Sequence, residues 1–237
     1  MFYDILAKFY DIIFPKNLTI YKFLDNYVIN QPSNILDIAC GTGQYSIAFA
    51  QKGHNVYGID NNKNMIESAI NKAQLASIIV TFDIFDMMQL NLYNIQIFDF
   101  IFCIGNSIAH IKSIDELNNF FTNIYNKLKD NGYFVVHIIN YQNKNIFDKN
   151  FFPIISRENL QFIRWYEPSD NSGEIIFKAK LIHENKEYSI SNILLMLDVK
   201  QIYNYLQMKF SKVELFGDYN YSPYDINSNS AIFVCQK

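Results

Sequence analysis

The stretch ILDIACGTGQYS, residues Ile35–Ser46, places a short apolar run directly before two glycines and a helical pattern. Glycine allows backbone conformations with positive φ and a close approach to a ligand, and the first turn of a helix favours an anionic group. The stretch therefore predicts a strand, a tight turn and a helix that cradle a nucleotide-like ligand. Ser46 follows Gly41 and Gly43 where a dinucleotide fingerprint has its third glycine, so the loop alone does not identify the ligand.

Strand-like and helical patterns alternate through the first 140 residues. The strand-like runs are almost continuous in apolar residues, as expected for parallel strands that are buried on both faces. The clearest helical pattern, Ser113–Leu128, begins with an S-x-x-E capping box and is followed by Gly132. Repeated strand–helix units predict an α/β fold with a doubly wound parallel sheet. The five strands expected in this sheet are Asn34–Ala39, Asn55–Ile59, Ile78–Phe82, Phe98–Cys103 and Tyr133–Ile139.

Residues after 160 follow a different pattern. Between Glu174 and Ile182, apolar residues alternate with Lys178 and Lys180, as in an antiparallel strand with one buried face. No flexible linker separates this segment from its neighbours, so we expect an insertion and not an independent domain. The three strands expected in it are Gln161–Tyr166, Glu174–Ile182 and Glu187–Leu194.

The C-terminal residues are expected to return to the main sheet. Asp198 begins a helix, and the strands Lys212–Gly217 and Ala231–Gln236 should pair as a hairpin because no helix joins them. The expected organisation has three parts, which are a cofactor-binding core with N-terminal lid helices at 1–160, an antiparallel insertion at 161–195, and a helix and hairpin that complete the core at 196–237.

Composition argues against several classes of protein. The net charge of −3 disfavours a nucleic-acid-binding face. Three cysteines without framework spacing and four isolated histidines disfavour a disulfide scaffold and a metal site. There is no apolar run of about 18 residues and no signal-peptide pattern, so we expect a cytoplasmic protein that does not bind membranes.

Asp37 distinguishes between two kinds of nucleotide-like ligand, a dinucleotide and a ligand that carries a methionine moiety. At the end of the first expected strand, a carboxylate would repel a pyrophosphate, but it would attract the ammonium group of a methionine moiety. Asp60 suits the ribose of either class. At this point the chain resembles the class I S-adenosylmethionine-dependent methyltransferases, whose D/E-x-G-x-G-x-G loop matches Asp37, Ala39, Gly41 and Gly43. Ala39 replaces the first glycine of that loop.

The resemblance continues along the chain in the order of the family. Asp60, at the end of VYGID, resembles the residue that binds the ribose hydroxyls, and Met65 resembles one that packs on the adenine. Asp86 resembles the acidic residue at the adenine amino group, and Asp83 competes with it for that role. The resemblance implies S-adenosyl-L-methionine as cofactor and a Rossmann-like, seven-stranded sheet with an antiparallel C-terminal strand. The residues implied to contact the cofactor are Tyr10, Asp37, Ala39, Cys40, Gly41, Gly43, Asp60, Asn61, Met65, Asp86, Met87, Cys103 and Ile104.

Two segments resemble one branch of this family. GNSIAH at Gly105–His110 resembles the G-N-S-h-x-H stretch of glycine N-methyltransferases and related small-molecule N-methyltransferases. FYDILAKFYDII, at 2–13, resembles the lead-in of the same branch, including the amino-sugar N,N-dimethyltransferases, and makes Tyr10 the counterpart of a lid tyrosine. The antiparallel strands after residue 160 resemble a sheet that walls the substrate pocket in this branch.

One departure from the branch concerns the acceptor. Glycine N-methyltransferases carry an arginine before an N-Y pair, which binds the substrate carboxylate, but Ile139 precedes Asn140 and Tyr141 here. Glycine is therefore not the expected substrate. Arg164, on the expected inserted sheet, is either a substitute ligand for a carboxylate or a solvated strand residue.

The resemblance implies in-line transfer of a methyl group to a small-molecule acceptor, with an amine nitrogen preferred. His110 is either a base for the amine or a residue that orders its loop, while Tyr10 and Tyr141 are candidates for positioning the acceptor. O- or C-methylation of a small metabolite is an alternative, as is cofactor binding without turnover. No partner besides the acceptor is expected, and the chain is expected to be a monomer or a homodimer.

Overall fold

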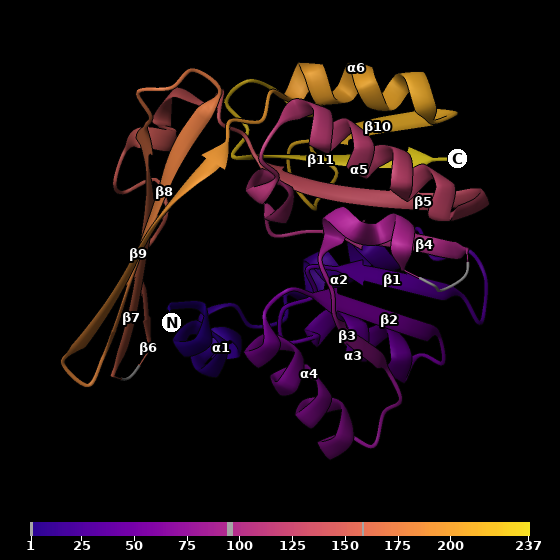
Figure 1. Ribbon diagram of the computed structural model, residues 1–237, viewed down its shortest axis with the longest axis horizontal. Helices are drawn as coiled ribbons and strands as arrows, with labels where there is room; N and C mark the ends of the chain where they lie inside the picture. Colours follow the sequence, from indigo (N-terminus) through magenta and orange to yellow (C-terminus); the bar gives the residue numbers. More distant parts are fainter. Residues whose placement is uncertain (1, 94–96, 158) are drawn as a thin grey trace.

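The computed structural model describes residues 2–93, 97–157 and 159–237, which form two β-sheets and the helices around them (Figure 1). The main sheet has seven strands in the order β10-β11-β5-β4-β1-β2-β3. The predicted α/β class, seven-stranded sheet and separate antiparallel sheet are confirmed. The strands of the main sheet are β1 Asn34–Ile38, β2 Asn55–Asp60, β3 Thr81–Ile84, β4 Phe98–Cys103, β5 Leu128–Ile139, β10 Lys212–Phe216 and β11 Ser230–Gln236.

Pairing in the main sheet places a ligand crevice at the ends of β1 and β4. These two strands are parallel neighbours, and β1 also pairs with β2, so the strand order reverses between β1 and β4. Open α/β sheets bind ligands at the carboxyl ends of the strands beside such a reversal. Strand β11 runs antiparallel to both of its neighbours in this sheet, β5 and β10, which agrees with the expected antiparallel C-terminal strand.

Helices cover both faces of the main sheet. Side chains of α2 and α3 pack in one core cluster, and those of α5 and α6 pack in another. The helices are α1 Phe2–Ile13, α2 Leu18–Asp25, α3 Gln44–Gln51, α4 Lys63–Leu75, α5 Ile114–Lys127 and α6 Val199–Lys209, with short 3-10 turns η1 Met87–Leu92, η2 Ser107–His110 and η3 Lys144–Phe147. None of the helices in the described residues has the length and apolar character that crossing a membrane requires.

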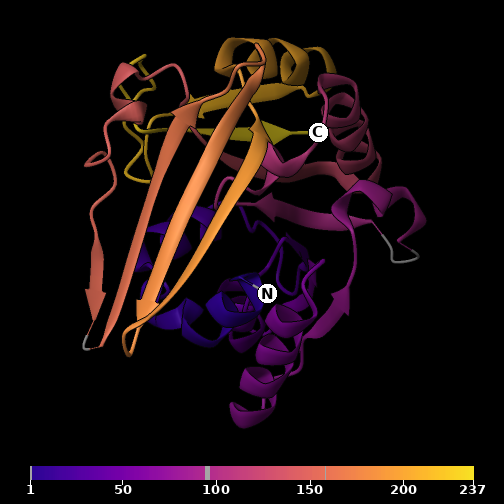
Figure 2. The same ribbon diagram turned by 60° about the vertical axis from the view of Figure 1, so that its left-hand side comes forward.

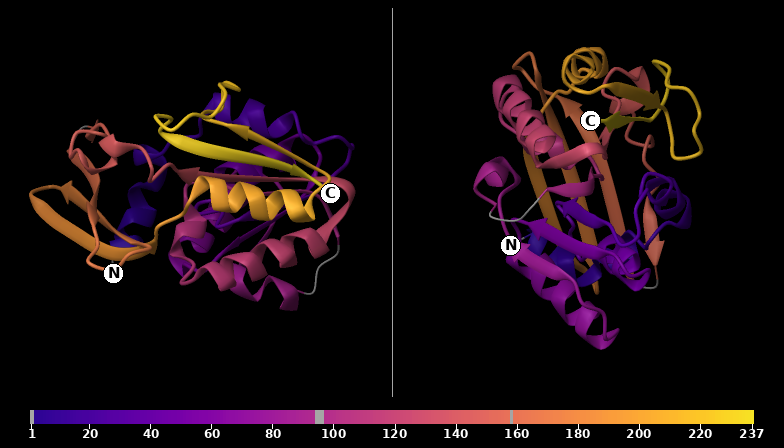
Figure 3. Two further views of the ribbon diagram at one scale, coloured as in Figure 1. Left: turned by 90° about the horizontal axis from the view of Figure 1, so that it is seen from above. Right: turned by 90° about the vertical axis from the view of Figure 1, so that its right-hand side faces the viewer.

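The second sheet has four antiparallel strands in the order β6-β7-β8-β9. It stands beside the main sheet, and α1 lies between the two (Figures 1 and 2). Buried side chains of α1 pack against Phe162 and Leu181 of this sheet and against Met65 of α4. The view from above in Figure 3 shows the same arrangement. The strands are β6 Ile155–Arg157, β7 Leu160–Pro168, β8 Glu174–His183 and β9 Lys186–Leu195.

Two element boundaries and one short strand differ most from those expected from sequence. Strand β3 begins at Thr81 and not at Ile78, because only residues from Thr81 onward pair with β2 and Ile79 is exposed. Leu128, expected to be the last helical residue, is the first residue of β5 and pairs with Phe98. The short β6 was not expected, because its three residues show no alternating pattern and are ordered by pairing with β7.

Candidate active site

The glycine loop joins the end of β1 to α3 and is held by the end of β2. Gly41 and Gly43 have φ values of +54° and +72°, and Ala39, which stands in place of a glycine, has a φ of +56°. One carboxylate oxygen of Asp60 accepts a hydrogen bond from the Gly41 backbone N–H at 2.9 Å, and the other accepts from that of Asn62 at 2.8 Å. Asp60 therefore anchors the loop to the end of β2, and its side chain stays partly accessible.

Asp37 is a buried carboxyl at the end of β1. It is 3% exposed and accepts a hydrogen bond from the Ser46 hydroxyl at 2.6 Å, and the Ser46 backbone N–H also interacts with it. Burial raises the pKa of Asp37 to about 8, and the nearby Asp60 contributes to the rise. An isolated buried carboxylate is unfavourable, so the site is prepared to receive a positively charged group.

Helix α1 carries Tyr10 over the glycine loop. A Cβ atom added at Gly41 would lie 3.5 Å from the Tyr10 ring, so the ring covers this part of the loop. Burial raises the pKa of Tyr10, which keeps its phenol neutral. Its aromatic face can contact a sulfonium or an ammonium group.

Two aspartates of the FYDILAKFYDII segment fasten α1, and sequence analysis gave neither of them a role. Asp11 accepts hydrogen bonds from the Thr42 hydroxyl and from Gln44 Nε2, the latter at 2.8 Å, and it pairs with Lys72 at 2.6 Å. Asp4 accepts a hydrogen bond from Asn64 Nδ2 at 2.7 Å. In the sequence, these two aspartates are marked only by the repeated Tyr-Asp pair of the segment.

The expected adenine-binding residues lie at different depths. Met65 is 5% exposed and packs in the cluster of α1 and the second sheet. Asp86 is exposed and caps η1 by accepting from the Met88 backbone N–H at 2.9 Å. Asp83, the other candidate for the adenine amino group, accepts a hydrogen bond from the Tyr93 hydroxyl at 2.6 Å through one carboxylate oxygen.

The remaining residues implied to contact the cofactor flank these groups. Cys40 is half-buried beside the glycine loop, and Asn61 is exposed after β2. Cys103 ends β4, pairs with Ile38 of β1 and is fully buried, while Ile104 after it is half-buried. Met87 packs against the same apolar cluster as Cys103. No described contact joins Met87 to the glycine loop.

The loop after β4 unites the two sheets through Asn106, which has a φ of +70°. Its side-chain oxygen accepts from the Ile139 backbone N–H at 2.9 Å. Its Nδ2 group donates to the hydroxyl of Tyr141 at 2.7 Å and to that of Tyr166, on β7, at 3.4 Å. Burial raises the pKa of both phenols, in the case of Tyr166 to about 12. Tyr166 was not expected from sequence, because its partner is 60 residues away in the chain.

His110 ends η2 and keeps an exposed side chain. Its ring lies edge-on to that of Tyr3 on α1, with centroids 6.5 Å apart. The surrounding protein partly desolvates the imidazole and lowers its pKa. Tyr3 in turn accepts a hydrogen bond from Asn192 of β9 at 3.1 Å. The imidazole is therefore neutral at pH 7 and lies between α1, the loop after β4 and the second sheet.

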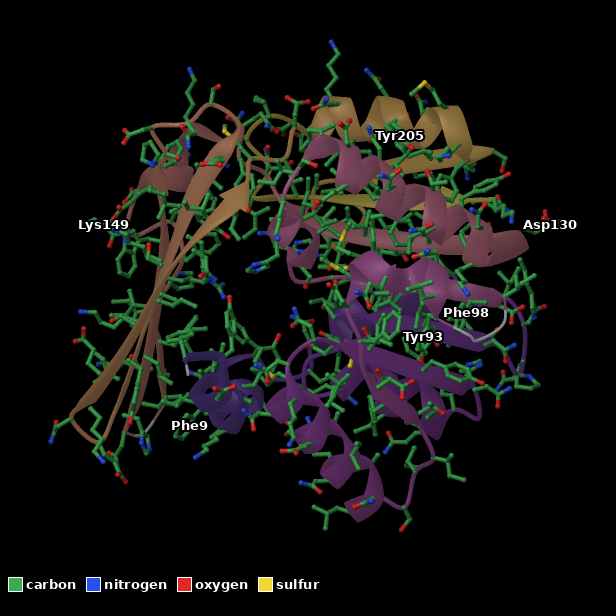
Figure 4. All side chains as sticks on the ribbon, in the orientation of Figure 1. Phe9, Tyr93, Phe98, Asp130, Lys149 and Tyr205 are labelled. Atoms are coloured by element: carbon green, nitrogen blue, oxygen red, sulfur yellow. The ribbon has the colours of Figure 1, made fainter. Side chains whose placement is uncertain are left out.

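Arg164 lies on β7 and is partly buried, so it is not a fully solvated strand residue. Its Nε atom is buried without a hydrogen-bond partner, and its guanidinium carbon lies over the rings of Phe14 and Phe152. Phe9 on α1, labelled in Figure 4, also faces this sheet, and its ring lies 4.5 Å from that of His183.

The charged and aromatic groups around the glycine loop can be compared with what each kind of cofactor needs. Within the described ranges, no group of three His, Cys, Asp or Glu side chains could hold a metal ion. Asp37 is a buried carboxyl, and Asp60 is a partly accessible one. The Tyr10 ring covers the turn between them. These features fit the ammonium, hydroxyl and sulfonium groups of S-adenosylmethionine.

Comparison with known proteins bears on the family and the fold. A family model described as a methyltransferase domain matches residues 29–205. The chain is 29% identical over 107 residues to a glycine/sarcosine N-methyltransferase of Aphanothece halophytica, covering 45% of this chain and 40% of that protein. It is also 29% identical over 106 residues to a ubiquinone biosynthesis O-methyltransferase of Rickettsia typhi, covering 45% and 41%. The chain thus spans less than half the length of these curated relatives.

Solved structures show the same fold over almost the whole chain. A S-adenosylmethionine-dependent methyltransferase from Clostridium acetobutylicum ATCC 824 superimposes with a TM-score of 0.80 at 19% identity, covering 99% of this chain and 98% of the other. The SAM-bound amino pentose methyltransferase CalS10 from Micromonospora echinaspora gives a TM-score of 0.66 at 15% identity, covering 94% and 92%. The family model, the fold and the glycine loop agree, and the chain belongs to the class I methyltransferases that use S-adenosylmethionine.

Proposed function

We propose that this methyltransferase acts on the nitrogen of a small-molecule amine. S-adenosylmethionine supplies an electrophilic methyl group, so the protein must position an acceptor more than activate a nucleophile. The observation that carries the proposal is the cluster of Asn106, Tyr141 and Tyr166, in which one amide brings together a hydroxyl from the turn after β5 and one from β7.

The chemistry of this cluster suits an amine. The phenols stay neutral because burial raises their pKa values, so their oxygens can accept hydrogen bonds from an N–H group. Such bonds would turn the nitrogen lone pair away from Tyr141 and Tyr166. Methylation of an amine leaves a cation, and the rings of Tyr10, Tyr141 and Tyr166 can stabilise that charge.

His110 is proposed as the group that removes the amine proton. Its imidazole is neutral at pH 7 because its pKa is lowered, and its loop is the one that carries Asn106. O-methylation is the second candidate, since the same imidazole could take a hydroxyl proton and one of the relatives is an O-methyltransferase. Asp37, Asp60 and Tyr10 are proposed to hold the cofactor in either case.

The test uses cofactor with a labelled methyl group and matched panels of amines, alcohols and phenols. Mass spectrometry should find the label on amines. The variants Tyr141→Phe and Tyr166→Phe should lower kcat/KM by about 10- to 100-fold, as expected for lost hydrogen bonds to a positioned acceptor. Binding of S-adenosylhomocysteine should be unchanged in both.

Tyr205→Phe is the matched control, because that phenol lies on α6 away from the site (Figure 4) and donates its hydrogen bond to the Asn118 carbonyl. It should leave kcat/KM unchanged. Label found on alcohols or phenols alone would refute the amine assignment. Binding of S-adenosylhomocysteine with no labelled product would favour a protein that binds the cofactor without turnover.

A further inference from the structure

Arg164 occupies the inner face of the second sheet. Alternate residues of a strand share a face, so Arg164 lies on the same face as Phe162 and Tyr166, each of which is only 3% exposed. Across the sheet it pairs with Ala179 of β8, which in turn pairs with Ile190 of β9. The cross-strand neighbours of Arg164 are therefore small or apolar. This face of the sheet packs against α1.

The guanidinium has aromatic contacts and lacks polar ones. Its central carbon lies 5.2 Å from the ring centroid of Phe14 and 4.8 Å from that of Phe152. Its buried Nε has no hydrogen-bond partner, and no carboxylate of the described residues forms an ion pair with it. The titratable groups nearest to it are the phenols of Tyr166 and Tyr10, which burial keeps neutral. Arg164 is thus a partly buried cation without a counter-charge among the described residues.

A negatively charged ligand would give this guanidinium the ion-pair partner that the protein does not provide. A buried charge is normally paired, and contact with ring faces recovers only part of the cost of desolvation. Burial lowers the pKa of Arg164, but a guanidinium keeps its proton at physiological pH. Its N–H donors form a planar fork that matches the oxygens of a carboxylate or phosphate.

Arg164 lies close to the cluster that is proposed to hold the acceptor. Tyr166 is two residues further along β7, which is about 7 Å of strand, and its hydroxyl belongs to the cluster with Asn106. An acceptor nitrogen held by that cluster would therefore be a few bonds from a group held by Arg164. Ile139 offers no cation beside Tyr141, whereas Arg164 is a cation two residues from Tyr166 on β7.

We infer that Arg164 binds an anionic oxygen group of the acceptor, so that the substrate is a small amine bearing a carboxylate or a phosphate. This inference rests on the proposed function, because it takes the cluster around Asn106 as the place of the reacting nitrogen. It adds a substrate class that the fold and the glycine loop do not specify.

The test offers short amines in three matched forms, as the carboxylate, as its neutral primary amide, and as the phosphate ester. Binding of each form to the protein saturated with S-adenosylhomocysteine is measured by ligand-detected NMR and titration, and methylation by mass spectrometry. The wild-type protein should bind one anionic form at least tenfold more tightly than the amide. Preference for the carboxylate or for the phosphate identifies which anion is used.

Arg164→Gln should abolish this preference and lower kcat/KM for the anionic form by about 100-fold, the range expected when a buried charged partner is lost. Arg157→Gln is the matched control, because Arg157 is exposed on β6 and donates to the Ser156 carbonyl. It should behave as the wild type.

Two results would overturn the inference. They are a wild-type protein that binds no anionic form more tightly than its amide, and an Arg164→Gln variant that keeps the preference. Failure of the proposed function would be seen separately, as labelling of acceptors other than amines or as loss of S-adenosylhomocysteine binding. Unchanged S-adenosylhomocysteine binding in Arg164→Gln would show that the variant is folded.

Discussion

The buried Asp37 carboxyl should couple cofactor binding to the release of a proton. With a pKa of about 8, most of this carboxyl is protonated in the free protein at pH 7. The ammonium group of the cofactor should bind the ionised form. About 0.9 proton should therefore leave per molecule bound at pH 7, and the apparent Kd for S-adenosylhomocysteine should fall about 25-fold from pH 6.5 to pH 8.5.

The same carboxyl should reduce the stability of the free protein. Its pKa is about 8 when folded and about 3.9 when unfolded, so the folded state holds an additional proton between these values. Stability contributed by this proton is complete below about pH 4 and is lost as the pH rises toward 8. The loss at pH 7 is at most about 4 kcal/mol.

The variant Asp37→Asn tests both effects. It should raise the melting temperature of the free protein at pH 7.5, remove the pH dependence of binding, and weaken S-adenosylhomocysteine by at least about 30-fold. Calorimetric titrations in buffers with different ionisation enthalpies measure the proton release. Ser46→Ala, which removes the hydrogen bond and keeps the carboxyl, is the control. A Kd that is constant from pH 6.5 to pH 8.5 in the wild-type protein would refute the reasoning.

Three further predictions concern neighbouring groups. Asp60→Ala should weaken S-adenosylhomocysteine binding by tenfold or more, because it frees the Gly41 N–H and removes the proposed ribose ligand; unchanged titration curves would remove Asp60 from the site. Gly43→Ala should destabilise the fold by about 2–4 kcal/mol in chemical denaturation, since its Cβ would lie 2.5 Å from Phe82 at a φ of +72°. His110→Ala should slow turnover and abolish the fall in kcat/KM below about pH 6.5; wild-type turnover throughout would exclude it as a base.

The sequence carried most of the information on the main sheet. Parallel strands buried on both faces produce apolar runs that stand out from the chain, and β4 was located at both ends for this reason. Helix α5 was found from its capping box and its buried stripe. Edge positions were less clear, as at Thr81 in β3, because pairing on one side only leaves little compositional trace.

The candidate site was predictable where its residues are adjacent in sequence. The glycine loop and Asp60 are local to neighbouring strands, and their motif spacing predicted that they would meet. Tyr166 and Arg164 were different, because their surroundings are made by α1, the loop after β4 and the inserted sheet together. No local pattern distinguishes a strand arginine that faces water from one that faces an aromatic wall.

The second sheet has a consequence for how such enzymes diversify. It leaves the main sheet after β5 and returns at α6, so one continuous stretch of about forty residues carries its four strands. The glycine loop lies outside that stretch, near the other end of the chain. Under the proposed function, substitutions on the inner face of β7, β8 and β9 should change which molecule is accepted while the methyl donor remains the same. Acceptor specificity and cofactor binding would then be encoded in separate segments of the chain and could evolve independently.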